Sequence, residues 1–292
     1  MSKSKIDQWT KALLKKLFNK AANEAVKVIK EEVKKETKKE PKKEDGAEDE
    51  KTHSWRLCPI GEHWVTDHPL WVPPTDKRPG YHTTRDGHCA TNPTRGKSKV
   101  IKDYLTAEEM QMIADKHFSN LSGPPASGKL PEYVVGADNF DHFIRGWTKY
   151  WNDVFKPDEP LDPDLVKALI ATESSFKLKP LAPNAGIAGK AHGLIQLTDQ
   201  AIKALGDPKG ELLNHLVKIS TEDTSDPNLS IGAAVRWLCR KRDLASHRLK
   251  RQATWREAIA EYKSYLPDMV SGKDPNPEQM QKLDDIYKRL KK

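Results

Sequence analysis

The stretch that most constrains the fold of this 292-residue chain is residues 161–198, because it contains a strong helix start. It opens with Asp162, Pro163 and Asp164, which supply an N-cap acceptor, a proline at the first helical position and an acid near the positive end of the helix dipole. These signals predict a helix from about Pro163 to Glu173 or slightly beyond.

The end of this predicted helix places a carboxylate on an apolar face. Ile170, Leu169 and Val166 lie three, four and seven positions before Glu173, and these positions share one face of a helix. A carboxyl group at the edge of such a face suits a general acid. A glutamate at a helix end can also simply turn into solvent. The helix alone leaves both interpretations open.

Four short segments in the C-terminal half occur in a characteristic order. They are Glu173-Ser174-Ser175-Phe176, then Gly193-Leu194-Ile195-Gln196 after a loop rich in Pro and Gly, then DPNLSIG at residues 226–232, and finally AIAEY at residues 258–262. In this order they resemble the motifs of the soluble lytic transglycosylases, which are related to goose-type lysozyme: Glu-Ser-x-Phe, Gly-Leu-Met-Gln, Asn-Ile-x-x-Gly and Ala-x-Tyr-Asn-x-Gly. The resemblance covers roughly residues 161–266, and four motifs in order are more specific than any one of them.

The fourth segment departs from the family pattern directly after Tyr262. Lys263, Ser264 and Tyr265 stand where the family usually has Asn, a small residue and Gly. This departure leaves the substrate contacts near Tyr262 open.

The resemblance implies a mainly α fold with a lysozyme-like helical catalytic domain that acts on peptidoglycan. In this family one glutamate protonates the glycosidic oxygen between N-acetylmuramic acid (MurNAc) and N-acetylglucosamine (GlcNAc). It then acts as a base while the muramyl C6 hydroxyl attacks the anomeric carbon, which gives a 1,6-anhydro product without a second carboxylate. Carried over by position, Glu173 is the acid and base, and the hydroxyl of Tyr262 orients it. The substrate contacts implied by the resemblance are Ser174, Gly193 and Gln196.

Two other functions are compatible with the same sequence. If water replaces the C6 hydroxyl, the site is that of a hydrolytic muramidase, and Asp223, Asp226 and Glu261 are available to position the water. An inactive protein that keeps the lysozyme-like fold for cell-wall binding or a structural role is the other alternative, which the altered residues after Tyr262 favour. The presence of Glu173, Ser174 and Gln196 together argues against it.

Composition divides the chain into five expected regions. The pattern of residues 1–33 predicts a basic amphipathic helix. This helix would dock on its own protein or a partner, or lie on a membrane surface. The alternative is that the segment is a disordered tail. Residues 34–54 are a charged linker with almost no apolar side chain. Residues 55–128 predict a small irregular module with a few strands, residues 129–270 the lysozyme-like transglycosylase domain, and residues 271–292 a polar helical tail.

The module at residues 55–128 contains side chains that can bind metals. The candidate ligands are Cys58, His63, His68, His82, His88 and Cys89. Their spacing lacks the paired Cys-x-x-Cys or His-x3-5-His clips of specific zinc sites, so structural zinc is not favoured. No cofactor is expected for catalysis. The chain's three cysteines predict no disulfide framework, and Cys239 is expected to be a buried side chain in a helix.

The net charge of +8 favours acidic partners but does not choose among nucleic acid, anionic lipid and an anionic cell-wall polymer. The resemblance implies peptidoglycan glycan strands, and no nucleic acid is expected. We see no apolar run of transmembrane length and no signal peptide. We therefore expect synthesis in the cytoplasm and action in the periplasm or cell wall. We expect delivery by a secretion apparatus of the type VI kind, with the protein as an antibacterial effector. Its partners would then be a secretion carrier and a cognate inhibitor protein. The alternative is a phage enzyme.

Overall fold

The computed structural model describes residues 55–59, 61–92, 103–125, 130, 132–133, 136–178, 188–212 and 214–292. The predicted helix at residues 1–33 and the predicted linker at residues 34–54 lie outside the described residues. Within the described part of the chain, no helix is long and apolar enough to cross a membrane.

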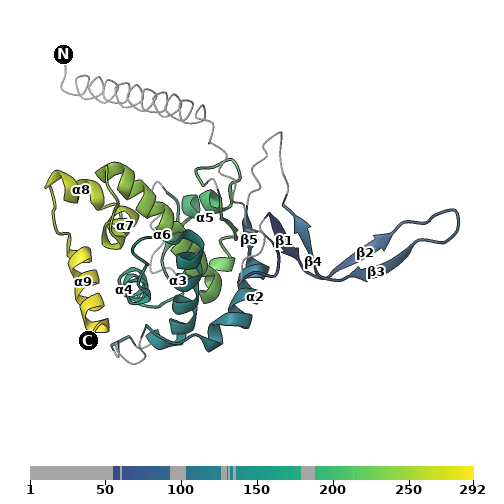
Figure 1. Ribbon diagram of the computed structural model, residues 1–292, viewed down its shortest axis with the longest axis horizontal. Helices are drawn as coiled ribbons and strands as arrows, with labels where there is room; N and C mark the ends of the chain where they lie inside the picture. Colours follow the sequence, from purple (N-terminus) through teal and green to yellow (C-terminus); the bar gives the residue numbers. More distant parts are fainter. Residues whose placement is uncertain are drawn as a thin grey trace, which may run out of the picture. The chain divides into compact units, whose positions relative to one another are not determined.

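Eight α-helices form the body of the described structure (Figure 1). They are α2 (Ala107–His117), α3 (Asp141–Phe155), α4 (Pro163–Glu173), α5 (Asp199–Gly206), α6 (Pro227–Leu249), α7 (Trp255–Tyr262), α8 (Leu266–Ser271) and α9 (Glu278–Leu290). Three short 3-10 turns lie at Phe118–Asn120, Ala137–Phe140 and Asp223–Ser225. This helical body confirms the predicted mainly α fold class.

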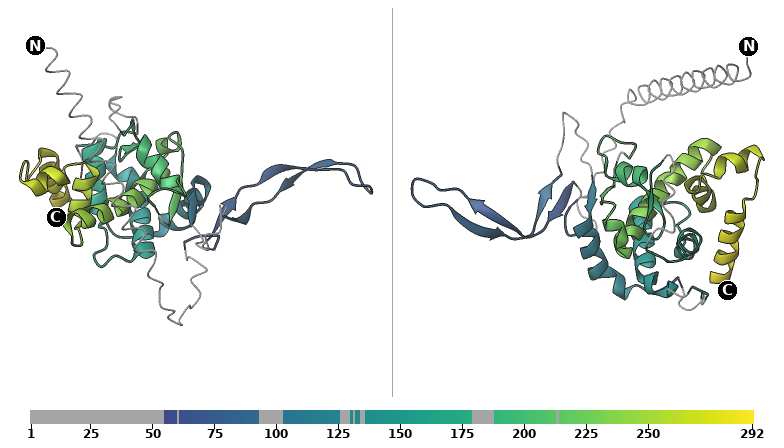
Figure 2. Two further views of the ribbon diagram at one scale, coloured as in Figure 1. Left: turned by 90° about the horizontal axis from the view of Figure 1, so that it is seen from above. Right: turned by 180° about the vertical axis from the view of Figure 1, so that it is seen from behind.

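The strands form four two-stranded pairs. Strands β1 (Glu62–Val65) and β4 (His88–Thr91) are antiparallel, as are β2 (His68–Val72) and β3 (Tyr81–Arg85). Because β2 and β3 lie between β1 and β4 in sequence, the four strands make one long two-part hairpin, which extends away from the helices (Figure 2). Strand β5 (Tyr104–Thr106) pairs in parallel with β8 (Leu216–Lys218), and β6 (Ala191–His192) is antiparallel to β7 (Leu197–Thr198).

Helix α6 runs through the core and is packed against α2, α3, α5 and α7. A side chain at Gly232 would meet the Trp147 ring at 2.7 Å, so the absence of one lets α3 approach α6 closely. The indole of Trp147 donates to Asn228 Oδ1 at 2.7 Å, and the indole of Trp151 donates to the Gly232 carbonyl at 2.9 Å. The aromatic-rich helix α3 therefore covers the core.

Helix α4 begins and ends where the sequence predicts. Asp162 Oδ1 accepts the Asp164 amide at 2.9 Å, and Pro163 is the first helical residue. The side chain of Lys167 is fully buried and pairs with Asp138 in the 3-10 turn before α3 at 3.0 Å, and with Asp141, the first residue of α3, at 2.7 Å. Asp141 is buried and Asp138 is partly exposed, and the two ion pairs join α4 to α3.

The predicted polar tail helix is α9, and its apolar face belongs to the core. Met280, Leu283, Ile286 and Leu290 are all buried, at the spacing of a single helix face. Helix α9 packs along α4, so the tail supports the helix that carries Glu173.

The ends of α5, α6 and α7 are well defined. Gly206 is the last residue of α5, and a Cβ there would lie 3.5 Å from the Val217 carbonyl oxygen of β8. Helix α6 continues to Leu249. Helix α7 ends at Tyr262, because Ser264 adopts a left-handed conformation (φ 63°) and the Tyr265 amide donates back to the Ala260 carbonyl at 2.8 Å.

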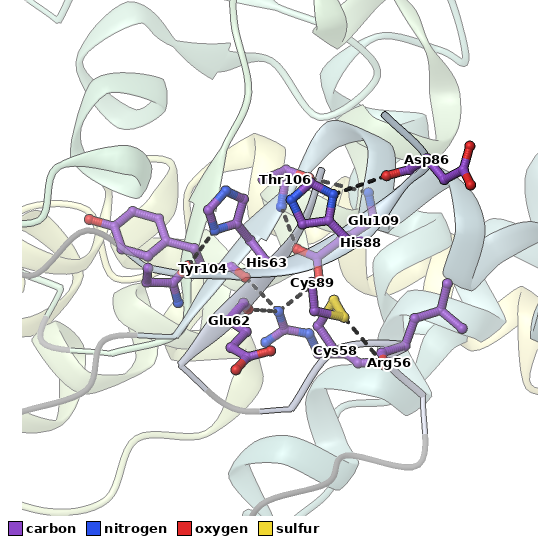
Figure 3. The surroundings of a disulfide bond; sticks show 12 residues. Arg56, Cys58, Glu62, His63, Asp86, His88, Cys89, Tyr104, Thr106 and Glu109 are labelled. Atoms are coloured by element: carbon purple, nitrogen blue, oxygen red, sulfur yellow. Dashed lines mark hydrogen bonds and ion pairs between the residues drawn. A yellow bond between two sulfur atoms is a disulfide. The ribbon is translucent and has the colours of Figure 1, made fainter. Parts of the chain in front are cut away.

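A buried arginine ties the base of the hairpin to the helical body (Figure 3). Arg56 donates to Glu109 Oε1 and to the Tyr104 carbonyl, both at 2.8 Å, and it also pairs with Asp103. Burial alone would raise the pKa of Asp103, but the bonds and charges of His215 and Arg56 outweigh it and hold that pKa below its usual value. The contact of Asp103 with His215 joins the predicted module at residues 55–128 to the predicted domain at residues 129–270. The boundary between the two at residue 128 stays a prediction.

Cys58 and Cys89 form a disulfide with a Cα–Cα distance of 5.5 Å. The expectation of no disulfide framework is wrong for this pair. Because both cysteines are in the bridge, neither is free to bind zinc, for which they were candidates. The physical reason is the hairpin, because β1 and β4 pair Trp64 with Cys89 and return the chain to the region of Cys58. Cys239 is the free cysteine, and burial raises the pKa of its thiol to about 12.

The four histidines among the candidate zinc ligands contact other groups in the hairpin. His63 bonds to an asparagine side chain at 2.9 Å, His68 and His88 each bond a backbone oxygen two residues earlier at 3.0 Å, and the His82 ring packs on Trp71. Within the described residues, no group of three or more His, Cys, Asp or Glu side chains is arranged to hold a metal ion.

Replacing Arg56 by Met should destabilise the fold by about 3–5 kcal/mol, because it leaves buried carboxylates without their partner. Urea unfolding monitored by circular dichroism measures the change. The control is Arg289→Met, which breaks an exposed pair with Glu132 and should cost about 1 kcal/mol or less. Equal stability of the two variants would contradict the role of Arg56.

Alkylation of the native, unreduced protein should leave Cys58 and Cys89 unmodified, and reduction should make both reactive. Peptide mass spectrometry distinguishes the two states. A Cys58→Ser, Cys89→Ser double variant should lose about 3 kcal/mol of stability, because the bridge closes a loop of 31 residues. Rapid labelling of both cysteines before reduction would show that the bridge does not form.

Candidate active site

The chain turns sharply directly after Glu173, the last residue of α4. Ser175 and Phe176 both have left-handed backbone conformations, with φ of 51° and 63°. Such a conformation costs about 1–3 kcal/mol for each non-glycine residue and persists only where the surroundings enforce it. Here the Phe176 side chain is fully buried and stacks on Phe140 at 6.1 Å. Burial of this ring holds the turn that leaves Glu173 at the helix end.

Ser174 lies on the inner side of this turn. Its side chain is completely buried, and its hydroxyl oxygen is 3.4 Å from the Ile170 carbonyl. Its amide also donates to the same carbonyl, at 3.0 Å. In this arrangement Ser174 closes the last turn of α4, and its contact with substrate stays a prediction.

The Gly-Leu-Ile-Gln segment connects β6 to β7 and rests on the start of α6. Gly193 has φ +70°, and a Cβ there would lie 2.8 Å from the Thr224 carbonyl oxygen. The next amide, of Leu194, donates to Ser230 Oγ at 3.0 Å. Glycine is therefore required here by its backbone conformation and by close packing on the protein itself, besides the close approach to sugar that we expected.

The same segment contacts the end of α7. Gln196 has φ 56°, and its side-chain amide donates to the Gly193 carbonyl at 2.8 Å. The Tyr262 hydroxyl donates to the Ile195 carbonyl at 2.5 Å. Burial, and then the negative charge of Glu173, raise the pKa of Tyr262 well above its usual value, so it stays a neutral phenol.

The side chain bonded to Glu173 is Lys263. Its ammonium pairs with Glu173 Oε1, and the two side chains are only 7% and 17% exposed. The resemblance implied that Tyr262 orients Glu173. In the structure the Tyr262 hydroxyl donates a hydrogen bond to the Ile195 carbonyl, and Lys263 makes the contact with the carboxylate. The motif departure at residue 263 was the sequence signal, but it did not reveal this partner.

A hollow of about 220 Å³ is lined by Gln196 and Tyr262. Trp237 and Lys241 of α6 line it together with Gln200 of α5. An aromatic ring beside amide and ammonium groups is a suitable lining for a polar, ring-shaped ligand such as a sugar.

The three further carboxylates considered for positioning water have structural partners. Asp226 Oδ1 accepts the first amides of α6 at 2.7 and 3.3 Å, and so serves as its N-cap. Asp223 accepts the Ser220 amide at 2.7 Å, and Glu261 pairs with Arg248 at 3.1 Å. Their oxygens are thus already engaged within the protein.

Residues 156–264 match the family model of the transglycosylase SLT domain. The C-terminal region is an SLT-type domain. The match begins just before α4 and ends just after α7, so it includes Glu173, Gln196 and Tyr262. Among curated proteins, no match to the chain is found.

The SLT domain supports, in general terms, peptidoglycan lytic transglycosylase activity at the cell wall. The expected secretion carrier, cognate inhibitor, delivery route and membrane-surface contact stay predictions.

Replacing Gly193 by Ala should destabilise the protein by about 1–3 kcal/mol, because the new Cβ meets Ser230 and Thr224 and the backbone conformation is left-handed. Thermal unfolding measures the effect. The matched control is Gly206→Ala, where the new Cβ makes only ordinary contact and stability should be unchanged or slightly raised. If Gly193→Ala were as stable as the control, the packing of this loop on α6 would be wrong.

Proposed function

We propose that this protein cleaves the β-1,4 bond between MurNAc and GlcNAc in peptidoglycan, with Glu173 as the only acid and base. The observation that carries the proposal is the position of Glu173 within the SLT match, at the end of α4. Its charge acts on Tyr262, whose hydroxyl bonds to the Gly-Leu-Ile-Gln loop. Glu173 is mostly buried, and it faces the end of α7 through Lys263.

In the proposed reaction the Glu173 carboxyl group gives its proton to the glycosidic oxygen, and the bond from that oxygen to the anomeric carbon breaks. The GlcNAc unit leaves with a free C4 hydroxyl. The Glu173 carboxylate then takes the proton of the muramyl C6 hydroxyl, while O6 bonds to the anomeric carbon. One proton enters and one leaves the glutamate, so the cycle closes without water.

The engagement of the other carboxylates that were considered supports a one-glutamate scheme. Ordinary glycosidases need a second carboxylate at about 5–9.5 Å, as a nucleophile or as a base for water. Asp226 is committed to the N-cap of α6, and Glu261 is paired with Arg248. The scheme with attack by the C6 hydroxyl needs neither. Hydrolysis by the same glutamate remains the alternative outcome, and the product tells the two apart.

The contact between Lys263 and Glu173 favours a second candidate, a binding protein without activity. A general acid must carry a proton at the start of the reaction, and an ammonium group bonded to it opposes that state. Such a protein would bind peptidoglycan through the same fold and cleave nothing.

The disulfide supports work outside the cytoplasm. Disulfides form and persist in oxidising compartments such as the bacterial periplasm, where peptidoglycan lies. We propose that the bridge between Cys58 and Cys89 is closed where the protein acts.

Replacing Glu173 by Gln should lower the rate of peptidoglycan clearance by at least about a hundredfold, because a sole acid and base contributes at least that much. Clearance of purified sacculi by turbidity measures the rate, and mass spectrometry of the products should find 1,6-anhydro-muramyl ends. The matched control is Glu278→Gln on the exposed start of α9, which removes the same charge and should keep full activity.

The other outcomes separate the candidates. Reducing muramyl ends in place of anhydro ends would make the enzyme a muramidase. Binding of sacculi without clearance by wild type at any pH would favour the inactive protein. Activity of Glu173→Gln within a few-fold of wild type would remove Glu173 from the mechanism.

A further inference from the structure

Lys263 occupies an unusual position for a lysine, beside the proposed acid. Its side chain is 7% exposed and pairs with Glu173. The two residues lie 90 positions apart in the chain, at the ends of α4 and α7. At this motif position the resembling family usually has an asparagine, which is neutral. In this chain a positively charged side chain therefore lies against the Glu173 carboxylate.

This charge conflicts with both parts of the proposed bond cleavage. A positive charge at hydrogen-bonding distance from a carboxyl group favours its charged form, and it does so strongly where side chains are mostly buried. The first step requires the protonated form. Positive charge also develops at the anomeric carbon as the bond breaks, and a nearby ammonium repels it. The observed arrangement is therefore suited to the resting enzyme and not to the transition state.

We propose that Lys263 is a positioning residue that restrains Glu173 in the free enzyme, and that its ammonium must leave the carboxylate before the glycosidic oxygen is protonated. The inference rests on the proposed function of Glu173. It assigns Lys263 an inhibitory role that the sugar chain must overcome when it binds.

The place of Lys263 on α7 gives its ammonium another set of acceptors. Lys263 is the C-cap residue, and the helix ends there because Ser264 is left-handed. The last carbonyls of a helix carry partial negative charge and accept bonds from lysine side chains near the C-terminus. The four-carbon stem of a lysine is flexible. The last carbonyls of α7 already accept the backbone amides of residues 263–265, but a carbonyl oxygen has two lone pairs. The ammonium can therefore reach a shared acceptor at the end of its own helix by side-chain rotation, without a change of backbone.

The other titratable groups around α4 are engaged elsewhere. Tyr262, also from α7, is a neutral phenol. Lys167 of α4 is paired with two aspartates. His192 of β6 is 2.7 Å from Asp199, and Lys291 beyond α9 pairs with Asp162 at the opposite end of α4. Among the described residues, Lys263 is the cation whose bond to Glu173 the structure records.

The test compares the pH dependence of glycan cleavage for wild type, Lys263→Asn, Lys263→Met and Lys263→Arg, from about pH 4 to about pH 9. On the alkaline side, the Asn and Met variants should stay active to a higher pH than wild type, because they lack the positive charge beside the carboxyl group. At about pH 8 their kcat should exceed that of wild type by about 3- to 10-fold. Lys263→Arg keeps the charge and should follow wild type.

A control variant accounts for overall charge. Lys282 is exposed on α9, so Lys282→Asn removes one positive charge away from Glu173 and should keep the wild-type profile. If the Asn and Met variants cleave glycan and wild type does not, Lys263 prevents Glu173 from acting altogether. That result would give the proposal its strongest support.

Three results would overturn the inference. If the Asn and Met variants keep the wild-type pH profile while Glu173→Gln is inactive, Lys263 does not restrain Glu173 and the proposed function stands. If they lose activity at every pH and Lys263→Arg restores it, Lys263 assists catalysis. If Glu173→Gln is as active as wild type, or if no variant cleaves at any pH, the proposed function fails and the inference fails with it.

Discussion

The packing of α6 in the core is the constraint on which the candidate site depends. The three parts of the site are the end of α4, the Gly193 loop and the end of α7, which are far apart in sequence. Each is supported by α6, either directly or through α3. Ser230 near its start supports the Gly193 loop. Arg242 near its end donates to the Ala253 carbonyl at 2.8 Å and lies over the Trp255 ring at 4.3 Å, which fixes the start of α7. Contact with α3, which is joined to α4 by buried charges, completes the frame.

The parts of the fold that could be predicted are those determined by residues close together in the sequence. The start of α4 follows from Asp162 and Pro163, and the capping boxes at Thr106 and Thr254 both form as the sequence predicts. The buried face of α9 was not predicted, because its apolar positions are diluted by charged residues and its partner α4 lies more than a hundred residues earlier. The disulfide was missed for a similar reason, since only the paired strands bring Cys58 and Cys89 together.

The candidate site divides in the same way. The order of the motifs placed Glu173, Gln196 and Tyr262 correctly within one domain, because motifs record local backbone shape. Which side chains touch each other depends on how α7 lies against α4, and no local pattern contains that. The sequence therefore pointed to residue 263 as a departure, while the identity of its partner came only from the tertiary structure.

The bridge at the base of the hairpin determines what happens when a protease cuts the hairpin. Residues 59–88 form the interior of a covalent ring closed by Cys58 and Cys89, and the exposed strands β2 and β3 lie inside it. A protease that cuts the hairpin would open the ring without releasing either piece. The two halves would remain one covalent molecule, with Arg56 still anchored in the helical body. A single cut in this exposed hairpin therefore need not divide the protein into two pieces.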